Sequence, residues 1–211
     1  MEEMIVTAVE PYNKGKGRVA ISLNDGFAFV LYKGELSQYG LDVGVKVDET
    51  LYERIMKETI FPRARKRGMN LLKTMDRTEA DVRRKLTEGG YPPEAVDDAI
   101  AYLASYHYID DDRYAGEYIR CKVSSMSRRQ IISKLSEKGI DKNVIENAFL
   151  IYDEENGTDP DESERELIER LIRKRCPQGT ESLDYNARQK LCAYLYGKGF
   201  SMSAIGSLLK T

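Results

Sequence analysis

Several residue types that carry chemistry are scarce in this 211-residue chain. It has no tryptophan, a single histidine (His107) and three cysteines, Cys121, Cys176 and Cys192. Any nucleophile–histidine–acid arrangement would have to use His107, which stands between two tyrosines, so a packed or helix-capping histidine is the simpler interpretation. The cysteines are 55 and 16 residues apart, which fits no zinc-binding pattern. We therefore expect reduced thiols and no metal.

Long apolar runs and nucleotide-binding motifs are also missing. No stretch of about 18 apolar residues occurs, so we expect no transmembrane helix. The segment Met1–Met4 has neither a basic start nor an apolar region, so a cytoplasmic protein is expected. No phosphate-binding loop or dinucleotide fingerprint is present. We expect no cofactor and no catalytic residues, and therefore no enzyme.

Charge is abundant, but it comes in blocks. The net charge is -2 and charged residues make up 32% of the chain, which is weak evidence against a dedicated DNA-binding protein. Residues 54–85 nevertheless contain eleven Lys or Arg and four Asp or Glu, whereas residues 146–169 contain ten acids and one Arg. Such blocks can steer partners that the average charge would not attract.

One short segment is written three times, as Leu86–Tyr91, Leu135–Ile140 and Leu195–Phe200. Each copy reads Leu-x-x-x-Gly-apolar and follows an amphipathic pattern, which indicates a tandem helical array. Gly90, Gly139 and Gly199 are expected to stop a helix in the left-handed conformation, which glycine adopts at little cost. The pattern predicts a mainly α fold with three tandem three-helix repeats in an elongated curved array.

The first 50 residues differ from the rest. Strand-like runs occur at Ile5–Val9, Val19–Leu23 and Phe27–Tyr32, with a hairpin signal at Asp25-Gly26 and another turn at 15–17. Lys33–Tyr39 is expected to form a short helix. The sequence thus predicts a small antiparallel β unit of about three strands before the repeats, with boundaries at 1–50, 51–107, 108–157 and 158–211.

The predicted starts and ends of the helices agree with the spacing of the three repeats. Thr78 and Ser127 lie at matching positions as N-caps, with Asp81 and Gln130 as their capping-box partners. A further helix is expected before each capped pair, at 64–75, 112–122 and 163–175, and Pro62 is expected to interrupt or begin a helix. The third helix pair is expected to start at Asp184. The composition of residues 153–162 predicts an acidic connector between the second and third repeats, which could act as a hinge.

The run Tyr108–Ala115 is distinctive, and with the three repeats it resembles the RecX family, the regulators of the RecA recombinase. Its matching residues are Asp110, Asp111, Arg113, Tyr114 and Ala115. The resemblance covers residues from about 60 to 211. It departs at His107, where the family commonly has glycine. The resemblance implies a protein that binds the RecA protein and the RecA–DNA filament, inhibits ATPase and strand exchange, and acts in recombination, DNA repair and the SOS response.

The acids of this run have a structural interpretation. Asp110–Asp112 can accept from the free amides at the start of the next helix, and Tyr114, Ala115 and Tyr118 give it a packing face. A paired-carboxylate metal site is the alternative, but no ligand-spaced His or further acid supports it. Core packing is likewise the first expectation for most of the 14 tyrosines, with base stacking as the alternative.

Basic clusters are the candidate contact residues for RecA or DNA. They are Arg63, Arg65, Lys66, Arg67, Lys73, Arg83, Arg84, Lys85, Arg128, Arg129, Arg173, Lys174 and Arg175. One interpretation makes them ordinary solvated helix faces and complements of helix dipoles. The other places them on one concave face that contacts phosphates or an acidic protein surface. Weak direct DNA binding by a helical-repeat protein stays open as the alternative function, and a monomer is expected.

Overall fold

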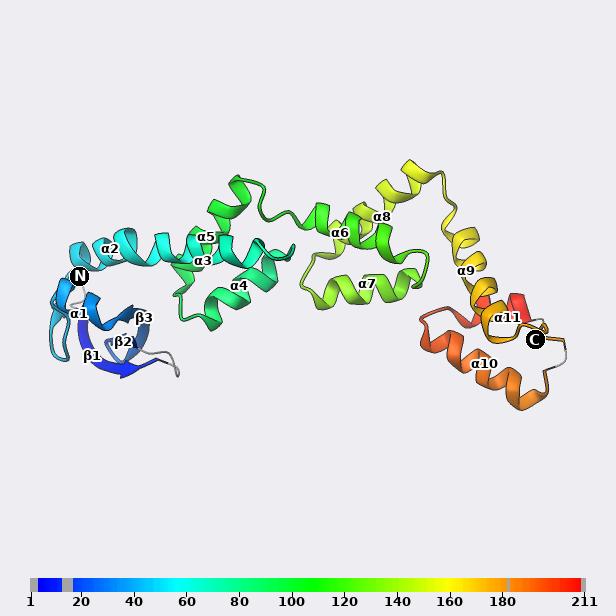
Figure 1. Ribbon diagram of the computed structural model, residues 1–211, viewed down its shortest axis with the longest axis horizontal. Coiled ribbons are helices and arrows are strands. Elements are labelled where there is room, and N and C mark those ends of the chain that lie inside the picture. The colour runs from blue at the N-terminus through cyan, green and yellow to red at the C-terminus, as the bar shows by residue number, and fades with distance from the viewer. Residues whose placement is uncertain (1–3, 13–16, 182, 210–211) are drawn as a thin grey trace. The chain divides into compact units, whose positions relative to one another are not determined.

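A computed structural model describes residues 4–12, 17–181 and 183–209 of the chain (Figure 1). The chain divides into two compact units, residues 1–110 and 111–211. The first unit has one hydrophobic core, and the second has two smaller ones. No helix among the described residues is long and apolar enough to cross a membrane.

The first unit begins with a four-stranded antiparallel sheet of order β3-β2-β1-β4. Its strands are β1 (Met4–Pro11), β2 (Arg18–Leu23), β3 (Gly26–Tyr32) and β4 (Lys46–Val47), and the helix α1 (Lys33–Tyr39) precedes β4. The three expected strands and the short helix are confirmed. The two-residue strand β4 was not expected, because its pattern is too short to read.

The hairpin between β2 and β3 turns one residue earlier than the Asp-Gly signal predicts. Asn24 and Asp25 take the positive φ values, 48° and 63°, and Gly26 already belongs to β3. The Asn24 side chain explains the shift, because its Oδ1 accepts the Ile5 amide at 2.8 Å and ties the turn to β1. Of the other expected turn, Gly17 has φ 85°, while residues 15 and 16 lie outside the described part.

A continuous helical segment leads from the sheet into the first repeat. It comprises α2 (Glu49–Ile55), a π-helical turn (Met56–Ile60) and α3 (Phe61–Leu72), which has Pro62 in its first turn. The Phe61 amide bonds to the carbonyl of Met56, five residues back. Because proline lacks an N–H and its ring needs room, the wider turn lets the helix continue through Pro62.

The remaining helices form the expected three-helix repeats. In the first repeat α3 is followed by α4 and α5, in the second α6 by α7 and α8, and in the third α9 by α10 and α11. Their bounds are α4 Glu79–Glu88, α5 Pro93–Ser105, α6 Asp111–Lys122, α7 Arg128–Glu137, α8 Lys142–Asn156, α9 Pro160–Arg175, α10 Tyr185–Gly197 and α11 Met202–Leu209.

The repeated Leu-x-x-x-Gly-apolar segment has the same geometry in all three copies. Gly90, Gly139 and Gly199 have φ values of 84°, 81° and 85°. In each copy the amide after the glycine donates to the carbonyl of the leucine five residues earlier, at 3.3, 3.2 and 3.4 Å. These are Schellman turns, which end a helix by satisfying its last carbonyls. The predicted left-handed stop is confirmed.

The predicted N-caps are confirmed, and the side chains of their predicted capping-box partners bind other groups. The hydroxyls of Thr78 and Ser127 each accept a backbone amide three residues on, at 3.2 Å. The Asp81 carboxylate instead binds two arginines, and the Gln130 side chain donates to the Gly197 carbonyl at 3.4 Å. The partner of Gln130 is 67 residues away, whereas those of Asp81 are only three and four residues away. Asp184 caps α10, as expected.

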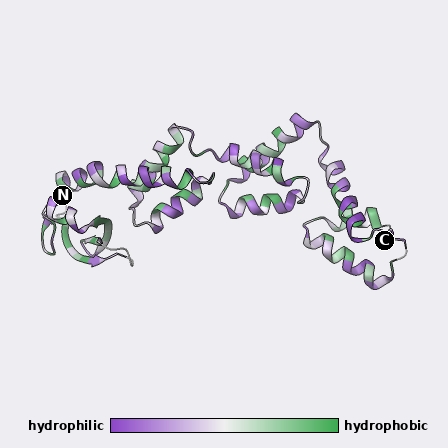
Figure 2. Cartoon of the chain, in the orientation of Figure 1, coloured by the Kyte–Doolittle hydropathy of each residue, from purple (hydrophilic) through white to green (hydrophobic). Residues whose placement is uncertain are grey.

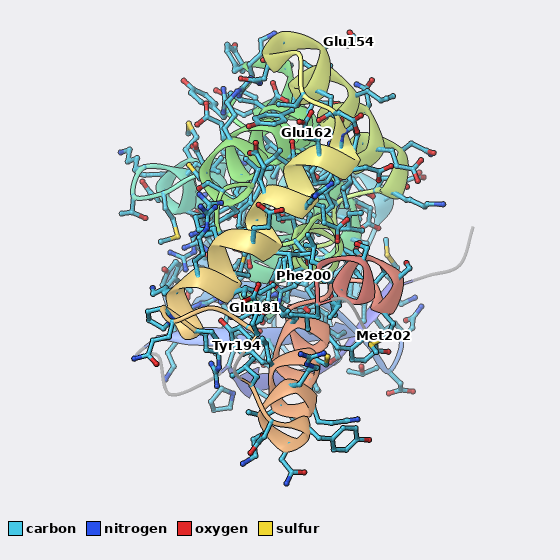
Figure 3. All side chains as sticks on the ribbon, turned by 90° about the vertical axis from the view of Figure 1, so that its right-hand side faces the viewer. Glu154, Glu162, Glu181, Tyr194, Phe200 and Met202 are labelled. Atoms are coloured by element: carbon cyan, nitrogen blue, oxygen red, sulfur yellow. The ribbon has the colours of Figure 1, made fainter. Side chains whose placement is uncertain are left out.

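Most of the expected acidic connector is helical. Helix α8 extends to Asn156 and α9 starts at Pro160, so only residues 157–159 join them. Figure 3 labels Glu154 and Glu162, which lie on the two helices on either side of this link. The connector is shorter than predicted because acid-rich sequence continues α8 and begins α9, where carboxylates favour the helix N-terminus.

Apolar side chains line the interior of each unit. Figure 2 shows largely hydrophobic strands and a predominantly hydrophilic α9. In the second repeat Ala115 is fully buried, and Tyr114 and Tyr118 pack against the same core, as the sequence predicts. In the third repeat Phe200 is fully buried, and Figure 3 shows it beside α9 and α11.

We expect Gly199→Ala to destabilise the second unit by about 1–2 kcal/mol, because a side chain resists positive φ. An added Cβ would also lie 2.6 Å from the Ser127 hydroxyl oxygen. Gly197→Ala is the matched control: it has open space and lies in α10, so it should be neutral or stabilising by up to about 1 kcal/mol. Thermal and urea unfolding followed by circular dichroism measure both. Equal stabilities would contradict the left-handed stop.

Candidate functional surface

The basic residues singled out by the sequence fall into two groups. Seven have an acidic or aromatic partner in the structure: Arg63, Arg65, Arg83, Arg84, Lys85, Arg128 and Arg175. The other six, among the described residues, form no ion pair: Lys66, Arg67, Lys73, Arg129, Arg173 and Lys174. This division separates cations that hold the fold together from cations that are available to a partner.

Two arginines of α3 link this helix to α1 and to α5. Arg63 forms an ion pair with Glu35 of α1, and its guanidinium lies 4.8 Å from the centre of the Tyr32 ring. Arg65 binds Asp98 of α5 through two hydrogen bonds of 2.7 and 2.6 Å. Bidentate pairs of this kind fix geometry as well as adding energy. Both arginines are therefore structural.

The cations of α4 belong to a network on the helix surface. Arg83 binds Glu79 and Asp97, and Arg84 binds Asp81 and Glu88. Lys85 contacts Glu88 at 3.3 Å. The network neutralises most of the positive charge that the sequence places in this part of the chain, because α4 and α5 supply the acids.

Asp81 is the central acid of this network. Partial burial raises the pKa of Asp81, but hydrogen bonds from Arg77 and Arg84 outweigh burial and hold that pKa below its ordinary value. The carboxylate is therefore charged in the folded protein at neutral pH, and it links the start of α4 to the segment before it.

In the second unit, two more arginines are engaged. Arg128 forms an ion pair with Asp153, and its guanidinium lies 4.5 Å from the centre of the Phe149 ring. Arg175 lies 4.1 Å from the centre of the Tyr194 ring. Figure 3 shows Tyr194 near the end of α9 that carries this arginine. These contacts anchor the ends of α8 and α9.

The unpaired cations are exposed. Lys66, Arg67 and Lys73 lie on or directly after α3, and Lys66 and Lys73 are on the side opposite the buried residues Ala64 and Gly68. Arg129 lies in the first turn of α7, and Arg173 and Lys174 lie in the last turn of α9. Each unit therefore has its own set of three available cations.

A groove lies beside α9 in the second unit. It has an open volume of about 570 Å³, and Tyr152, Glu166, Arg170 and Arg173 are among the residues that line it. Arg170 donates to the Ser124 carbonyl at 2.6 Å, and neither Arg170 nor Arg173 forms an ion pair among the described residues. Charges of both signs therefore face this space.

The second helix of each helix–turn–helix pair is poor in cations. Helix α5 carries Glu94, Asp97 and Asp98 and no Lys or Arg; α11 carries no charge among its described residues. Helix α8 has one lysine and four acids. A recognition helix that enters the major groove of DNA contacts bases and phosphates with basic and polar residues, so these helices do not suit that role.

The family signature opens the second repeat. Helix α6 starts at Asp111, directly after Asp110, and has Asp111 and Asp112 in its first turn, where negative charge offsets the helix dipole. Arg113 lines a small pocket between α6 and α8. Within the described ranges no group of three His, Cys, Asp or Glu residues could hold a metal ion.

Sequence reasoning missed the acids that neutralise the clusters. Glu35 and Asp98 are 28 and 33 residues away from their arginines, so no local spacing signals them. It also did not single out Tyr106 and Tyr108, whose side chains are exposed. Their placement directly after an amphipathic helix gives no signal, because an aromatic residue there has the same pattern whether it packs inward or outward.

Comparison with known proteins places the repeats in one family. Models of the first, second and third three-helix domains of RecX match residues 64–103, 110–148 and 162–209. The chain is similar to "Regulatory protein RecX" of Clostridium acetobutylicum, at 29% identity over 100% of this chain and 97% of the relative. The protein of that name from Caldanaerobacter subterraneus is 26% identical, with 98% of each chain covered.

The chain is also similar to solved structures of RecX proteins. A crystal structure of regulatory protein RecX covers 98% of both chains with a TM-score of 0.62 and 28% identity. The crystal structure of RecX from Lactobacillus salivarius has a TM-score of 0.56 at 25% identity, over 72% of this chain and 95% of the other.

We expect Asp81→Asn to lower the free energy of unfolding by about 1 kcal/mol at pH 7, because Arg77 and Arg84 lose their charged partner. A carboxyl with a depressed pKa contributes stability above its unfolded pKa, and this contribution is lost as the pH falls through the folded pKa. The difference between variant and parent should therefore shrink in acid. Urea unfolding at pH 7 and in acid measures this; a difference independent of pH would contradict it.

Proposed function

The chain belongs to the RecX family of regulatory proteins, and we propose that it binds RecA or the RecA–DNA filament as a non-catalytic regulator. Binding would lower the rates of DNA-dependent ATP hydrolysis and strand exchange by RecA. The observation that carries this proposal is the match of all three repeats, in order, to the three RecX domains.

The surface chemistry supports a binding role. Ion pairs and cation–π contacts fix the helices, so the surface that they present is preorganised, and binding then costs less conformational entropy. The two sets of free cations, one in each unit, complement acidic protein surface or phosphates. A filament of protein and nucleic acid offers both.

A non-catalytic role also agrees with the only histidine. His107 is exposed and lies in the turn after α5. A general base needs a nucleophile within hydrogen-bond reach, and the neighbours in sequence are tyrosines that stack with one another. Full regulatory activity of a His107→Ala variant is the corresponding expectation.

Direct action on DNA is the second candidate function. Its motive is the basic block at 54–85 and the free cations of α3. Against major-groove binding stands the acidic or uncharged character of α5, α8 and α11. Duplex binding through phosphates alone would show a steep decrease of affinity with salt, because counterions are released. A flat salt dependence with both single-stranded and duplex DNA would remove this candidate.

We expect Arg173→Gln combined with Lys174→Gln to raise the concentration needed for half-inhibition of the RecA ATPase by about tenfold, because two free cations of the second unit are removed. Arg165→Gln is the matched control: it lies on the same helix and is exposed, but it pairs with Glu169 at 3.2 Å. The assay is ATP hydrolysis by RecA on single-stranded DNA. Absence of any inhibition by the parent protein, with no filament binding, would refute the proposal.

A further inference from the structure

The groove beside α9 has both signs of charge along one helix face. Glu166, Glu169, Arg170 and Arg173 all line it, and they follow one another at the three- and four-residue spacings of a single helix face. The opposite face of α9 is buried in the core of the third repeat. The four charged side chains are therefore directed toward the open space of the groove.

The outer two of these four side chains are the ones available to a partner. Glu166 and Arg173 are exposed, and neither forms an ion pair within the described ranges. Glu169, which lies between them, is paired with Arg165 at 3.2 Å. Glu166 and Arg173 are seven residues apart, which is two helical turns and about 10 Å along the axis of α9. The groove thus presents one negative and one positive charge at a fixed spacing.

Hydrogen bonds and an ion pair fix the walls of the groove. Arg170 donates to the Ser124 carbonyl at 2.6 Å, which ties α9 to the turn between α6 and α7. The Thr158 hydroxyl donates to the Asp153 carboxylate at 3.1 Å, and Asp153 also pairs with Arg128. The groove is therefore formed before any partner binds, and binding costs little conformational entropy.

The charge pattern favours a polypeptide over nucleic acid and over a small ligand. The phosphates of a nucleic acid are all negative, so Glu166 would repel them. Small-molecule sites are lined mostly by apolar side chains, whereas one wall of this groove is charged. A protein surface offers acids and bases side by side, and such groups set orientation and specificity at interfaces. Tyr152 also lines the groove, and tyrosine is enriched among the residues that dominate protein interfaces.

We propose that the groove beside α9 holds a segment of RecA that presents a basic side chain to Glu166 and an acidic side chain to Arg173. The inference rests on the proposed function and adds to it the surface that the partner occupies. Lys174 directly follows Arg173 but does not line the groove. These two neighbouring cations therefore differ in role: Arg173 contacts the partner, and Lys174 is a solvated cation.

The test is inhibition of RecA ATP hydrolysis on single-stranded DNA by the full chain, together with cosedimentation of the chain with RecA filaments. Arg173→Gln should raise the concentration for half-inhibition by about tenfold, whereas Lys174→Gln, its matched control, should change that concentration by less than about twofold. Both side chains are exposed, so the fold should survive, and circular dichroism checks it.

The direction of the effect of Glu166→Gln identifies the occupant of the groove. If Glu166 contacts a basic side chain of RecA, this variant should raise the concentration for half-inhibition by about fivefold. Glu154→Gln is the matched control, because Glu154 is an exposed acid of the same unit that does not line the groove, and it should leave inhibition unchanged. If phosphates occupied the groove, Glu166→Gln would instead lower that concentration and tighten DNA binding in the absence of RecA.

Full inhibition by both Arg173→Gln and Glu166→Gln would overturn the proposal and leave the regulatory function intact. Stronger inhibition by Glu166→Gln would also overturn it, in favour of nucleic acid. So would a dimer of the parent chain in sedimentation velocity that Arg173→Gln converts to a monomer, because the groove would then hold a second copy. If the parent protein neither binds filaments nor inhibits hydrolysis, the proposed function itself fails, and this inference fails with it.

Discussion

The turn that ends α4, α7 and α10 combines a left-handed glycine with an amide that reaches back to a leucine carbonyl. Two of these turns have a second role. The carbonyls of Glu88 and Gly89 accept from Tyr12 and Arg18 of the β unit. The carbonyls of Gly197 and Lys198 accept from Gln130 and Ser127. The last carbonyls of a helix, which must find partners somewhere, thus become the points at which neighbouring elements attach.

One hydroxyl group illustrates how closely local and long-range structure are linked. Ser127 accepts the Gln130 amide as an N-cap and donates to the Lys198 carbonyl at 2.6 Å. A hydroxyl can do both at once, whereas an aspartate cap could only accept. The choice of serine at this cap therefore depends on a residue 71 positions away. It also explains why the glycine next to Lys198 must lack a side chain.

Much of the architecture could be predicted from the sequence. Periodicity and glycine placement identified the strands, the helix Lys33–Tyr39 and the three left-handed stops, because those signals are local. The capping-box role was not foreseen correctly for Gln130 because its side chain binds a carbonyl 67 residues away, and the Asp81 carboxylate binds the neighbouring residues Arg77 and Arg84. The exposed tyrosines were missed because an aromatic residue after an amphipathic helix has the same pattern whether it packs inward or outward.

The positively charged surface is the feature that the sequence alone predicts least well. The block at 54–85 has eleven cations against four acids, which suggests a strongly positive surface. In the fold, Arg63, Arg65 and Arg83 bind acids outside that block, and local composition cannot show this. The cations that stay available are those whose helix positions face away from acid-bearing neighbours. The positive surface is therefore smaller than the sequence implies, and helical phase rather than charge density decides where a partner can bind.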